Sequence, residues 1–361
     1  MHKVVRLNGP GWGRFCLAIR LCSFCCFLSG ALFSLAVAAG EKTGAPDKSL
    51  DFDDQPRVRE IKHPPWFKQS FLDLRQDLSD AIKHGKKGVI LYFAQDNCSY
   101  CEAFIKNNLG LSDIATYVQR NFDVIELDIW GERNLTDFDG DQFTEREFSI
   151  LHNTNFTPSL MFYVEGKKLA LFLRGYHDPY RFRAALRYVA ENIYKQSSFT
   201  DYMSRADELA KFDLGDLNKQ SFFIKPPYIL ARSIVPADRP LLVIFESRDC
   251  HACDVMHATT FEDQDILNRL ERFEVVQLDM NSQQPVITTL GTRTDAGRWA
   301  HRLGIVFAPT LIFFDKNGKE IIRLDSVTKV FRMGRVLDYV LSEGYLQGNY
   351  QQWLQGARRK H

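Results

Sequence analysis

Residues 89–101, with the sequence VILYFAQDNCSYC, predict the fold of the chain around them. The first five of these residues are aliphatic and aromatic, which predicts a short buried strand. Two cysteines separated by two residues follow that strand, at the point where a helix is expected to begin. Because a Cys-x-x-Cys pair between a buried strand and a helix is typical of a redox site, this stretch predicts both an α/β domain and its chemistry.

The same order of motifs returns in the second half of the chain. The run LLVIF, residues 241–245, predicts another buried strand, and it leads to Cys250-His251-Ala252-Cys253. At nearly the same distance after each cysteine pair comes a residue–proline step that precedes a further apolar run, Thr157-Pro158 in the first copy and Ala308-Pro309 in the second. Two copies of one motif order indicate an internal duplication.

Hydrophobic patterning predicts matching elements in the two copies. A helix is expected where apolar residues recur three or four positions apart, at Phe71, Leu74, Leu78, Ala81 and Ile82. The other elements expected in the first copy are helices near 112–120 and 178–194 and strands at 122–129, 159–164 and 169–173. Those expected in the second copy are strands at 241–245, 273–280, 310–314 and 320–324 and helices near 296–303 and 333–341. We therefore expect two tandem α/β domains, each with a central mixed sheet flanked by helices.

The N-terminal residues have the pattern of an export signal. A basic stretch ends at Arg20, and residues 21–39 are uncharged and mostly apolar. Ala36-Val37-Ala38 supplies the small residues that a signal peptidase requires. Four of the eight cysteines lie in this segment, namely Cys16, Cys22, Cys25 and Cys26. An uncleaved membrane anchor is the alternative, because the apolar run is at the lower end of the length that spans a bilayer.

Composition and polar stretches limit the partners and divide the chain. The formal net charge of +1 provides no basic field, so we expect no nucleic-acid partner. The charged, proline-bearing stretch after the signal predicts a flexible tether. The expected boundaries are a signal peptide at 1–38, a tether at 39–62, a first domain at 63–196, a linker at 197–219, a second domain at 220–346 and a tail at 347–361.

Cysteines outside the signal occur only as two close pairs, which favours chemistry over structural cross-linking. The start of a helix stabilises a thiolate through unpaired N–H groups and the helix dipole, so Cys98 and Cys250 are the expected attacking thiols. Cys101 and Cys253, one helical turn later, are the expected resolving thiols. Two alternatives stay open. One is a zinc site formed by both pairs, which their long separation disfavours, and the other is a redox-inert disulfide in one copy.

Both copies resemble thioredoxin-fold domains, over roughly residues 65–196 and 220–345. The expected fold class is therefore α/β, with two tandem thioredoxin-like domains. That family places a cis-proline beside its cysteine pair, and Pro158 and Pro309 match the position. The resemblance implies that the residue before each proline offers backbone groups to an extended client peptide. The candidate client-binding residues are Tyr100, Thr157, Pro158, His251, Ala308 and Pro309.

Within that fold, the first copy looks closest to the SoxW-type periplasmic thioredoxins. The stretches that carry this resemblance are Cys98-Ser99-Tyr100-Cys101, the loop 131–140, Phe156-Thr157-Pro158-Ser159, Arg174-Gly175-Tyr176 and Arg187-Tyr188-Val189. The resemblance implies an exported reductase that takes electrons from a membrane thiol transporter of the CcdA or DsbD type and passes them to client proteins with disulfides. We expect neither a cofactor nor a metal ion. A disulfide oxidase or isomerase and a peptide-docking module with little turnover are the alternatives.

Two positions depart from the thioredoxin pattern. Many members carry a buried acid that helps to deprotonate the resolving thiol, and this chain has Tyr92 and Ile244 there. Asn97 and Asp249 stand where many members have a Trp. Glu246 lies nearby in sequence, but a glutamate at the end of a strand is expected to be solvated.

His251 distinguishes the second cysteine pair from the first. A protonated imidazole beside Cys250 stabilises the thiolate and makes its disulfide more oxidising. An exposed histidine without effect is the alternative. With the effect, we expect electrons to flow from the first centre to the second.

Overall fold

The computed structural model describes residues 48–55, 61–208, 216–248 and 250–358. These residues belong to one compact unit. The expected signal peptide with its four cysteines, much of the expected tether, and Asp249 lie outside the described residues. Within the described ranges, no helix combines the length and the apolar character needed to cross a bilayer.

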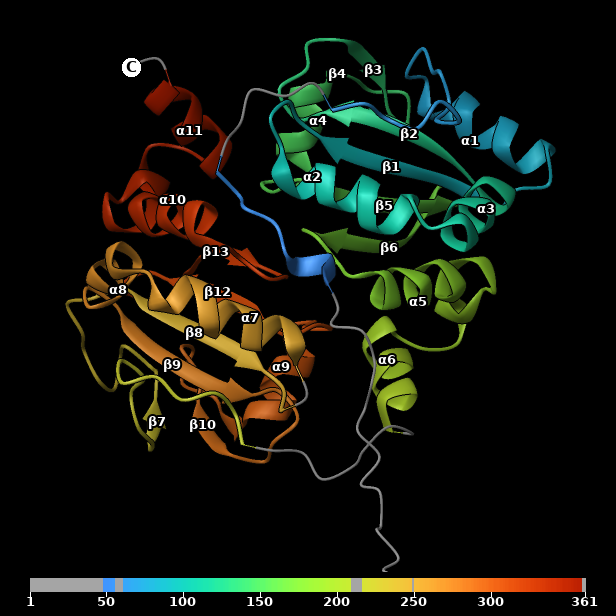
Figure 1. The fold of residues 1–361 in the computed structure, drawn as a ribbon. Coiled ribbons are helices and arrows are strands. Elements are labelled where there is room, and N and C mark those ends of the chain that lie inside the picture. The colour runs from blue at the N-terminus through green and yellow to red at the C-terminus, as the bar shows by residue number, and fades with distance from the viewer. Residues whose placement is uncertain (1–47, 56–60, 209–215, 249, 359–361) are drawn as a thin grey trace, which may run out of the picture. The chain divides into compact units, whose positions relative to one another are not determined.

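The first domain is built on a four-stranded sheet with the order β2-β1-β5-β6 (Figure 1). Its strands are β1 (Gly88–Ala94), β2 (Phe122–Asp128), β5 (Ser159–Val164) and β6 (Lys168–Arg174). β1 pairs parallel to β2 and antiparallel to β5, which pairs antiparallel to β6, so the sheet is mixed as expected. All of β1 is buried, and its alternate residues enter two separate core clusters because both faces of the sheet are covered.

The second domain repeats this sheet with the order β13-β12-β8-β9. Its strands are β8 (Leu241–Glu246), β9 (Glu274–Asp279), β12 (Thr310–Phe314) and β13 (Glu320–Leu324). β8 pairs parallel to β9 and antiparallel to β12, and β12 pairs antiparallel to β13. Strand order and pairing are the same in the two sheets, so the predicted duplication is confirmed in the fold.

Helices flank both sheets (Figure 1). Those of the first domain are α1 (Leu74–Lys83), α2 (Ser99–Phe104), the π-helical turn η2 (Ile105–Leu109), α3 (Ser112–Asn121), α4 (Glu145–Leu151), α5 (Pro179–Ala190) and the 3-10 turn η3 (Ile193–Lys195). Those of the second are α7 (His251–Thr259), the 3-10 turn η4 (Thr260–Glu262), α8 (Gln264–Leu270), α9 (Ala296–Arg302), α10 (Val330–Leu341) and the 3-10 turn η5 (Gly344–Leu346).

One residue expected in the first helix lies outside it. Phe71 is fully exposed, because α1 begins only after Asp73. The Asp73 side chain accepts hydrogen bonds from the backbone N–H groups of Arg75 and Gln76 and so caps the helix. The expectation for Phe71 is wrong because a capping residue outweighs the apolar spacing that precedes it.

Short elements complete the chain. They are η1 (Lys48–Leu50), the hairpin β3 (Asn134–Thr136) and β4 (Gln142–Thr144), helix α6 (Phe199–Glu208), the small sheet of β7 (Tyr228–Ile229), β10 (Pro285–Ile287) and β11 (Arg293–Asp295), and helix α11 (Tyr350–Arg358). Leu50, Phe199 and Tyr350 are buried. Segments expected as tether, linker and tail therefore each contribute apolar side chains to the packed core.

Candidate redox site

Each Cys-x-x-Cys pair lies where a buried strand leads into a helix. Cys98 is the N-cap of α2, and Cys250 is the N-cap of α7. The sulfur of each accepts a hydrogen bond of 3.0 Å from the backbone N–H of the second cysteine of its pair. Both pairs are disulfide-bonded, Cys98 to Cys101 and Cys250 to Cys253. After reduction, the helix start therefore stabilises a thiolate at the first cysteine of each pair.

Accessibility separates the two cysteines of each pair. Cys98 and Cys250 are 5% and 3% exposed, whereas Cys101 and Cys253 are 0% exposed. An attacking thiol has to be reached from outside, and a resolving thiol needs to reach only its neighbour. Each pair is closed on itself as a disulfide, and no bond joins the two pairs. The described part of the chain also contains no cluster of three or more His, Cys, Asp or Glu side chains that could hold a metal.

A proline loop precedes the central antiparallel strand of each sheet. The Thr157–Pro158 and Ala308–Pro309 peptide bonds are both cis. Thr157 Oγ1 lies 3.1 Å from Cys98 Sγ, so its hydroxyl can donate a hydrogen bond to a thiolate. Ala308 has no hydroxyl, and the second centre therefore lacks this means of stabilising its thiolate.

Tyr100 is enclosed by residues distant in sequence. Its hydroxyl donates to Asp54 Oδ2 at 3.1 Å and accepts from the backbone N–H of Lys329 at 2.8 Å. The guanidinium carbon of Arg332 lies 3.5 Å from the centroid of its ring. Burial raises the pKa of the phenol, so Tyr100 stays neutral. In this conformation the second domain covers the side chain that the sequence analysis assigns to client binding.

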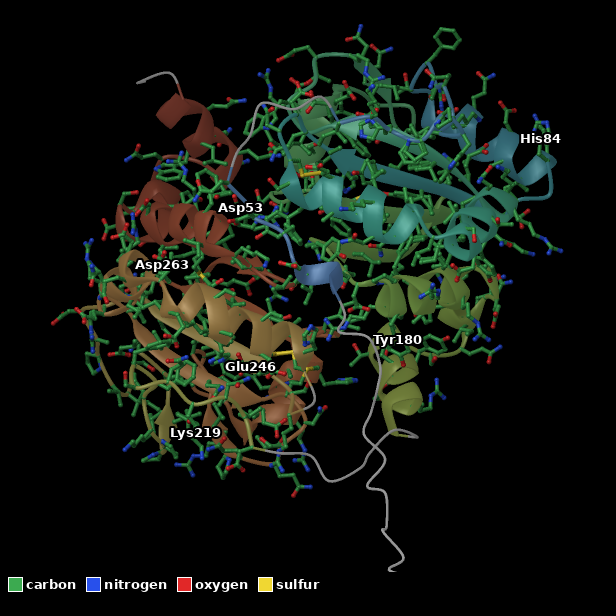
Figure 2. All side chains as sticks on the ribbon, in the orientation of Figure 1. Asp53, His84, Tyr180, Lys219, Glu246 and Asp263 are labelled. Carbon is green, nitrogen blue, oxygen red and sulfur yellow. A yellow bond between two sulfur atoms is a disulfide. The ribbon has the colours of Figure 1, made fainter. Side chains whose placement is uncertain are left out.

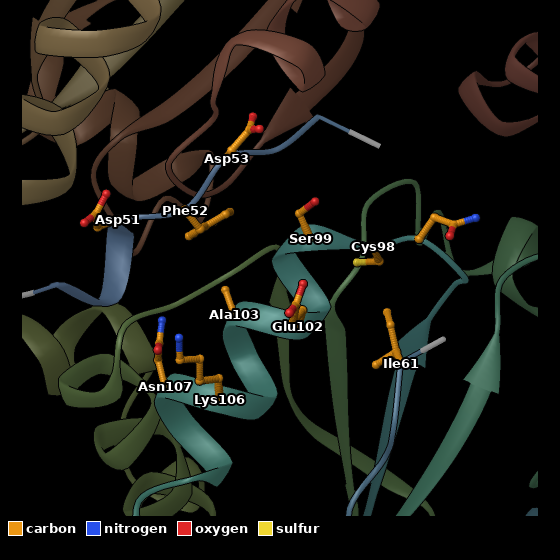
Figure 3. Close-up of a pocket in the computed structure, with 11 residues that line it drawn as sticks. Asp51, Phe52, Asp53, Ile61, Cys98, Ser99, Glu102, Ala103, Lys106 and Asn107 are labelled. Carbon is orange, nitrogen blue, oxygen red and sulfur yellow. The ribbon is translucent and has the colours of Figure 1, made fainter. Parts of the chain in front are cut away.

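The segment before the first domain also contributes to this site. Phe52 packs edge-on against Tyr100, with ring centroids 4.9 Å apart. A pocket of about 490 Å³ is lined by this segment and by the start of α2. Figure 3 shows Cys98 and Ser99 on the helix side of the pocket and Asp51, Phe52 and Asp53 on the other. Residues 51–53 fall in the stretch assigned to the tether, so part of that stretch lies beside the redox centre.

Glu246, which is labelled in Figure 2, is fully buried, so the expectation of a solvated glutamate is wrong. Its Oε1 lies 2.9 Å from His257 Nε2, and its Oε2 accepts from the side-chain amide of Gln277 at 2.7 Å. Glu246 is the last residue of β8 and, by strand alternation, shares a face with Ile244. His257 lies on α7 one turn after Cys253. Glu246, His257 and Gln277 therefore form a buried polar network that includes one residue of α7, the helix that begins at the second cysteine pair.

Other residues singled out in the sequence have different surroundings. Tyr92 and Ile244 are both fully buried, and burial raises the pKa of the Tyr92 phenol. Among the described residues, the Tyr92 hydroxyl has no hydrogen-bond partner. His251 is the first residue of α7 and is exposed. Its influence on the Cys250 thiolate stays a prediction.

The sequence does not predict the long-range contacts of four residues, namely Asp54, Arg181, Arg332 and His257. His257 carried a signal, because it stands one helical turn after Cys253 in the expected helix. Arg181 and Arg332 carried another, because they occupy matching positions in the two copies. Nothing in the local sequence around Asp54 indicates that it binds the start of a helix hundreds of residues later.

Known proteins match this chain in sequence and in structure. A family model described as a thioredoxin-like domain matches residues 74–190 and 231–341. A thioredoxin-fold protein from Helicobacter pylori aligns at 12% identity with a TM-score of 0.33, covering 39% of this chain and 94% of that one. A thioredoxin from Thermus thermophilus aligns at 21% identity with a TM-score of 0.26, covering 32% of this chain and 88% of that one. The C-terminal domain of DsbD from Neisseria meningitidis, in the reduced form, aligns at 16% identity with a TM-score of 0.24, covering 30% of this chain and 86% of that one. The comparison with curated proteins finds no match.

Proposed function

Since the chain belongs to the family of thioredoxin-like domains and contains the domain twice, we propose that it is an exported thiol–disulfide oxidoreductase that reduces disulfides of client proteins. The observation that carries the proposal is the pair of Cys-x-x-Cys disulfides, each at a helix start with its first sulfur bonded to a backbone N–H. Structural disulfides do not require this placement, whereas a thiolate nucleophile benefits from it.

The exchange at the first centre follows from the placement of its two sulfurs. With the pair reduced, the Cys98 thiolate attacks one sulfur of the client disulfide, and the other client sulfur leaves as a thiolate. Cys101, after losing its proton, then attacks Cys98 and releases the second client thiolate. The client gains two electrons and the centre becomes the Cys98–Cys101 disulfide. A membrane dithiol of the CcdA or DsbD type is the proposed donor that restores both thiols, and the periplasm is the proposed location.

Client docking is proposed at the proline loops. Thr157 lies in hydrogen-bonding range of Cys98 Sγ, so the backbone of this loop is next to the reacting atom. Ala308 holds the matching place before β12 in the second domain. An extended client main chain that pairs with these residues brings its disulfide to the first cysteine. The SoxW-type resemblance of the first domain is consistent with a periplasmic reductase of this kind.

A disulfide oxidase is the second candidate, and one contact favours it. The Thr157 hydroxyl beside Cys98 Sγ stabilises the thiolate and therefore the reduced form, which makes the first centre more oxidising. It also opposes the proposed electron flow from the first centre to the second, which rests on His251. Reduction potentials of the two centres separate these candidates, because a reductase requires the lower values.

Trapping of mixed disulfides tests the proposed function. The Cys101→Ala and Cys253→Ala variants, exported by cells, cannot resolve the intermediate and are expected to accumulate clients joined to Cys98 and Cys250. Non-reducing gels and mass spectrometry identify the linked cysteines. The matched controls Cys98→Ala and Cys250→Ala should trap no client. If partners are recovered only without a covalent bond, the chain is a peptide-docking module instead.

A further inference from the structure

Each thioredoxin-like domain places an arginine on the proline loop of the other. Arg332 of α10 donates to the carbonyl oxygen of Thr157 at 2.7 Å. Arg181 of α5 donates to the carbonyl oxygen of Ala308 at 2.8 Å. Thr157 and Ala308 are the two residues that precede a cis-proline at the start of a central strand. The same contact is therefore made in both directions.

The two arginines are also equivalent in the duplication. Arg181 is the third residue of α5 and Arg332 is the third residue of α10. Each guanidinium lies over the phenylalanine that precedes its target carbonyl, at 5.1 Å from the Phe307 ring for Arg181 and 5.4 Å from the Phe156 ring for Arg332. Incidental surface packing does not pair equivalent helix positions with equivalent loop positions twice. The two contacts therefore form one reciprocal arrangement, in which each domain binds the proline loop of the other.

Arg332 occupies the approach to the first redox centre. Its target carbonyl belongs to Thr157, whose hydroxyl is 3.1 Å from Cys98 Sγ. Cys98, Thr157 and Arg332 line one pocket of about 470 Å³. A client disulfide has to come within bonding distance of Cys98, and the carbonyl edge beside that sulfur is already hydrogen-bonded to a guanidinium. A client main chain that approaches the Thr157 carbonyl from the side occupied by this guanidinium has to displace Arg332.

Asp54 fixes the start of α10 at this position. Its carboxylate accepts from the backbone N–H groups of Phe331 and Arg332, at 3.0 and 2.8 Å, and also from the Tyr100 hydroxyl. The N-cap residue of α10, Lys329, makes no capping bond with its own side chain. A carboxylate at a helix start stabilises the helix through the same N–H groups and the dipole. Asp54 thus joins the helix that carries Arg332 to the tyrosine of the first redox motif.

First-domain residues also contact the proline loop beside the second redox centre. The His177 ring packs on Phe307 with centroids 4.5 Å apart, next to the bond from Arg181 to Ala308. Cys250 is slightly more buried than Cys98, with 3% of its surface exposed against 5%, and it belongs with Phe307 and Ala308 to a core cluster made mostly of first-domain residues. Both attacking thiols are therefore shielded in a conformation that each domain imposes on the other.

We propose that the resting protein is self-occluded: the client-docking edge of each domain is an interaction surface for the other domain, and an arriving client displaces Arg181 or Arg332. This inference deepens the proposed function, because it assigns the same proline loops both a client and an internal occupant. A client that offers a main-chain N–H to the Thr157 carbonyl replaces the bond that Arg332 gives up. Opening is therefore coupled to client binding.

Single arginine substitutions in the full chain test the proposal. The reduced protein is treated with a polyethylene-glycol maleimide, and labelling of each cysteine is followed by gel shift and mass spectrometry. Arg332→Ala is expected to accelerate labelling of Cys98, in the other domain, by about tenfold, because a hydrogen bond from a charged group is lost. Arg181→Ala is expected to do the same for Cys250.

Matched controls are Arg183→Ala and Arg269→Ala, which break the ion pairs with Asp113 and Asp338 and touch neither loop. Both labelling rates should stay unchanged in them. A local structural role for an arginine would instead alter the cysteine of its own domain. Circular dichroism checks folding, and a variant that does not fold is replaced by Arg→Lys, which keeps the charge without the planar fork.

The outcomes separate occlusion from the proposed function, because labelling needs no client. Unchanged labelling of Cys98 in Arg332→Ala and of Cys250 in Arg181→Ala overturns self-occlusion, even if the protein reduces insulin. Faster labelling together with no insulin reduction, in the wild type and in both variants, sustains self-occlusion and overturns the proposed function.

Discussion

Removal of the Glu246 carboxylate is expected to destabilise the second domain strongly. Its oxygens bond His257 at 2.9 Å and Gln277 at 2.7 Å, and the side chain is 0% exposed. Glu246→Ala leaves a buried imidazole and a buried amide without these acceptors and opens space beneath α7. Removing one partner of a buried pair costs about 3 to 5 kcal/mol. Since a whole domain is stable by only about 5 to 15 kcal/mol, this loss is a large part of the total.

Urea unfolding measures the effect. The transition of the second domain can be followed by the fluorescence of Trp299, which packs against Phe245 of β8. The control Glu191→Ala removes the exposed pair of Arg187 and Glu191 and should change stability little. Glu246→Gln keeps an acceptor oxygen and should lose less than Glu246→Ala. If Glu246→Ala shifts the midpoint no further than Glu191→Ala, the buried network does not stabilise the domain and the reasoning is refuted.

Three further predictions follow from single side chains. Thr157→Ala removes the hydroxyl 3.1 Å from Cys98 Sγ and should lower the potential of the first centre by about 30 mV in a glutathione titration, an effect absent if the hydroxyl does not stabilise the thiolate. Burial lowers the pKa of His177 to about 3, so the unfolded chain binds a proton below about pH 6.5 that the folded chain does not, and stability falls as pH drops. Between pH 7.5 and 4.5, the free energy of unfolding measured in urea should therefore fall by about 2 to 3 kcal/mol less in His177→Gln than in the wild type. Equal decreases in the two proteins would contradict this. His251→Ala should lower the potential of the second centre, whereas an unchanged potential means that the exposed imidazole has no influence.

Local patterns predicted the sheets and the cysteine pairs well. Strands such as β5 and β12 coincide with the expected 159–164 and 310–314, because continuous apolar runs bounded by proline and turn residues leave little choice. The two disulfides lie at helix starts as expected from the motif alone.

Contacts between distant segments could not be predicted from local patterns. Glu246 ends a strand, and only the positions of His257 and Gln277 make its burial favourable. Asp54 lies in a polar stretch that predicts a tether, yet its carboxylate caps a helix of the second domain. Periodicity and composition carry no information about which distant residue completes such a pair.

Redox titration of the full chain measures whether both cysteine pairs exchange electrons with thiols. The protein is equilibrated in glutathione and dithiothreitol buffers of stepped potential, trapped by alkylation, and analysed by mass spectrometry. We predict two complete two-electron transitions, one for Cys98 with Cys101 and one for Cys250 with Cys253, both above about −300 mV, the upper bound typical of structural disulfides. If both pairs stay oxidised until potentials below that value, they are structural disulfides, and the chain is not a thiol–disulfide oxidoreductase.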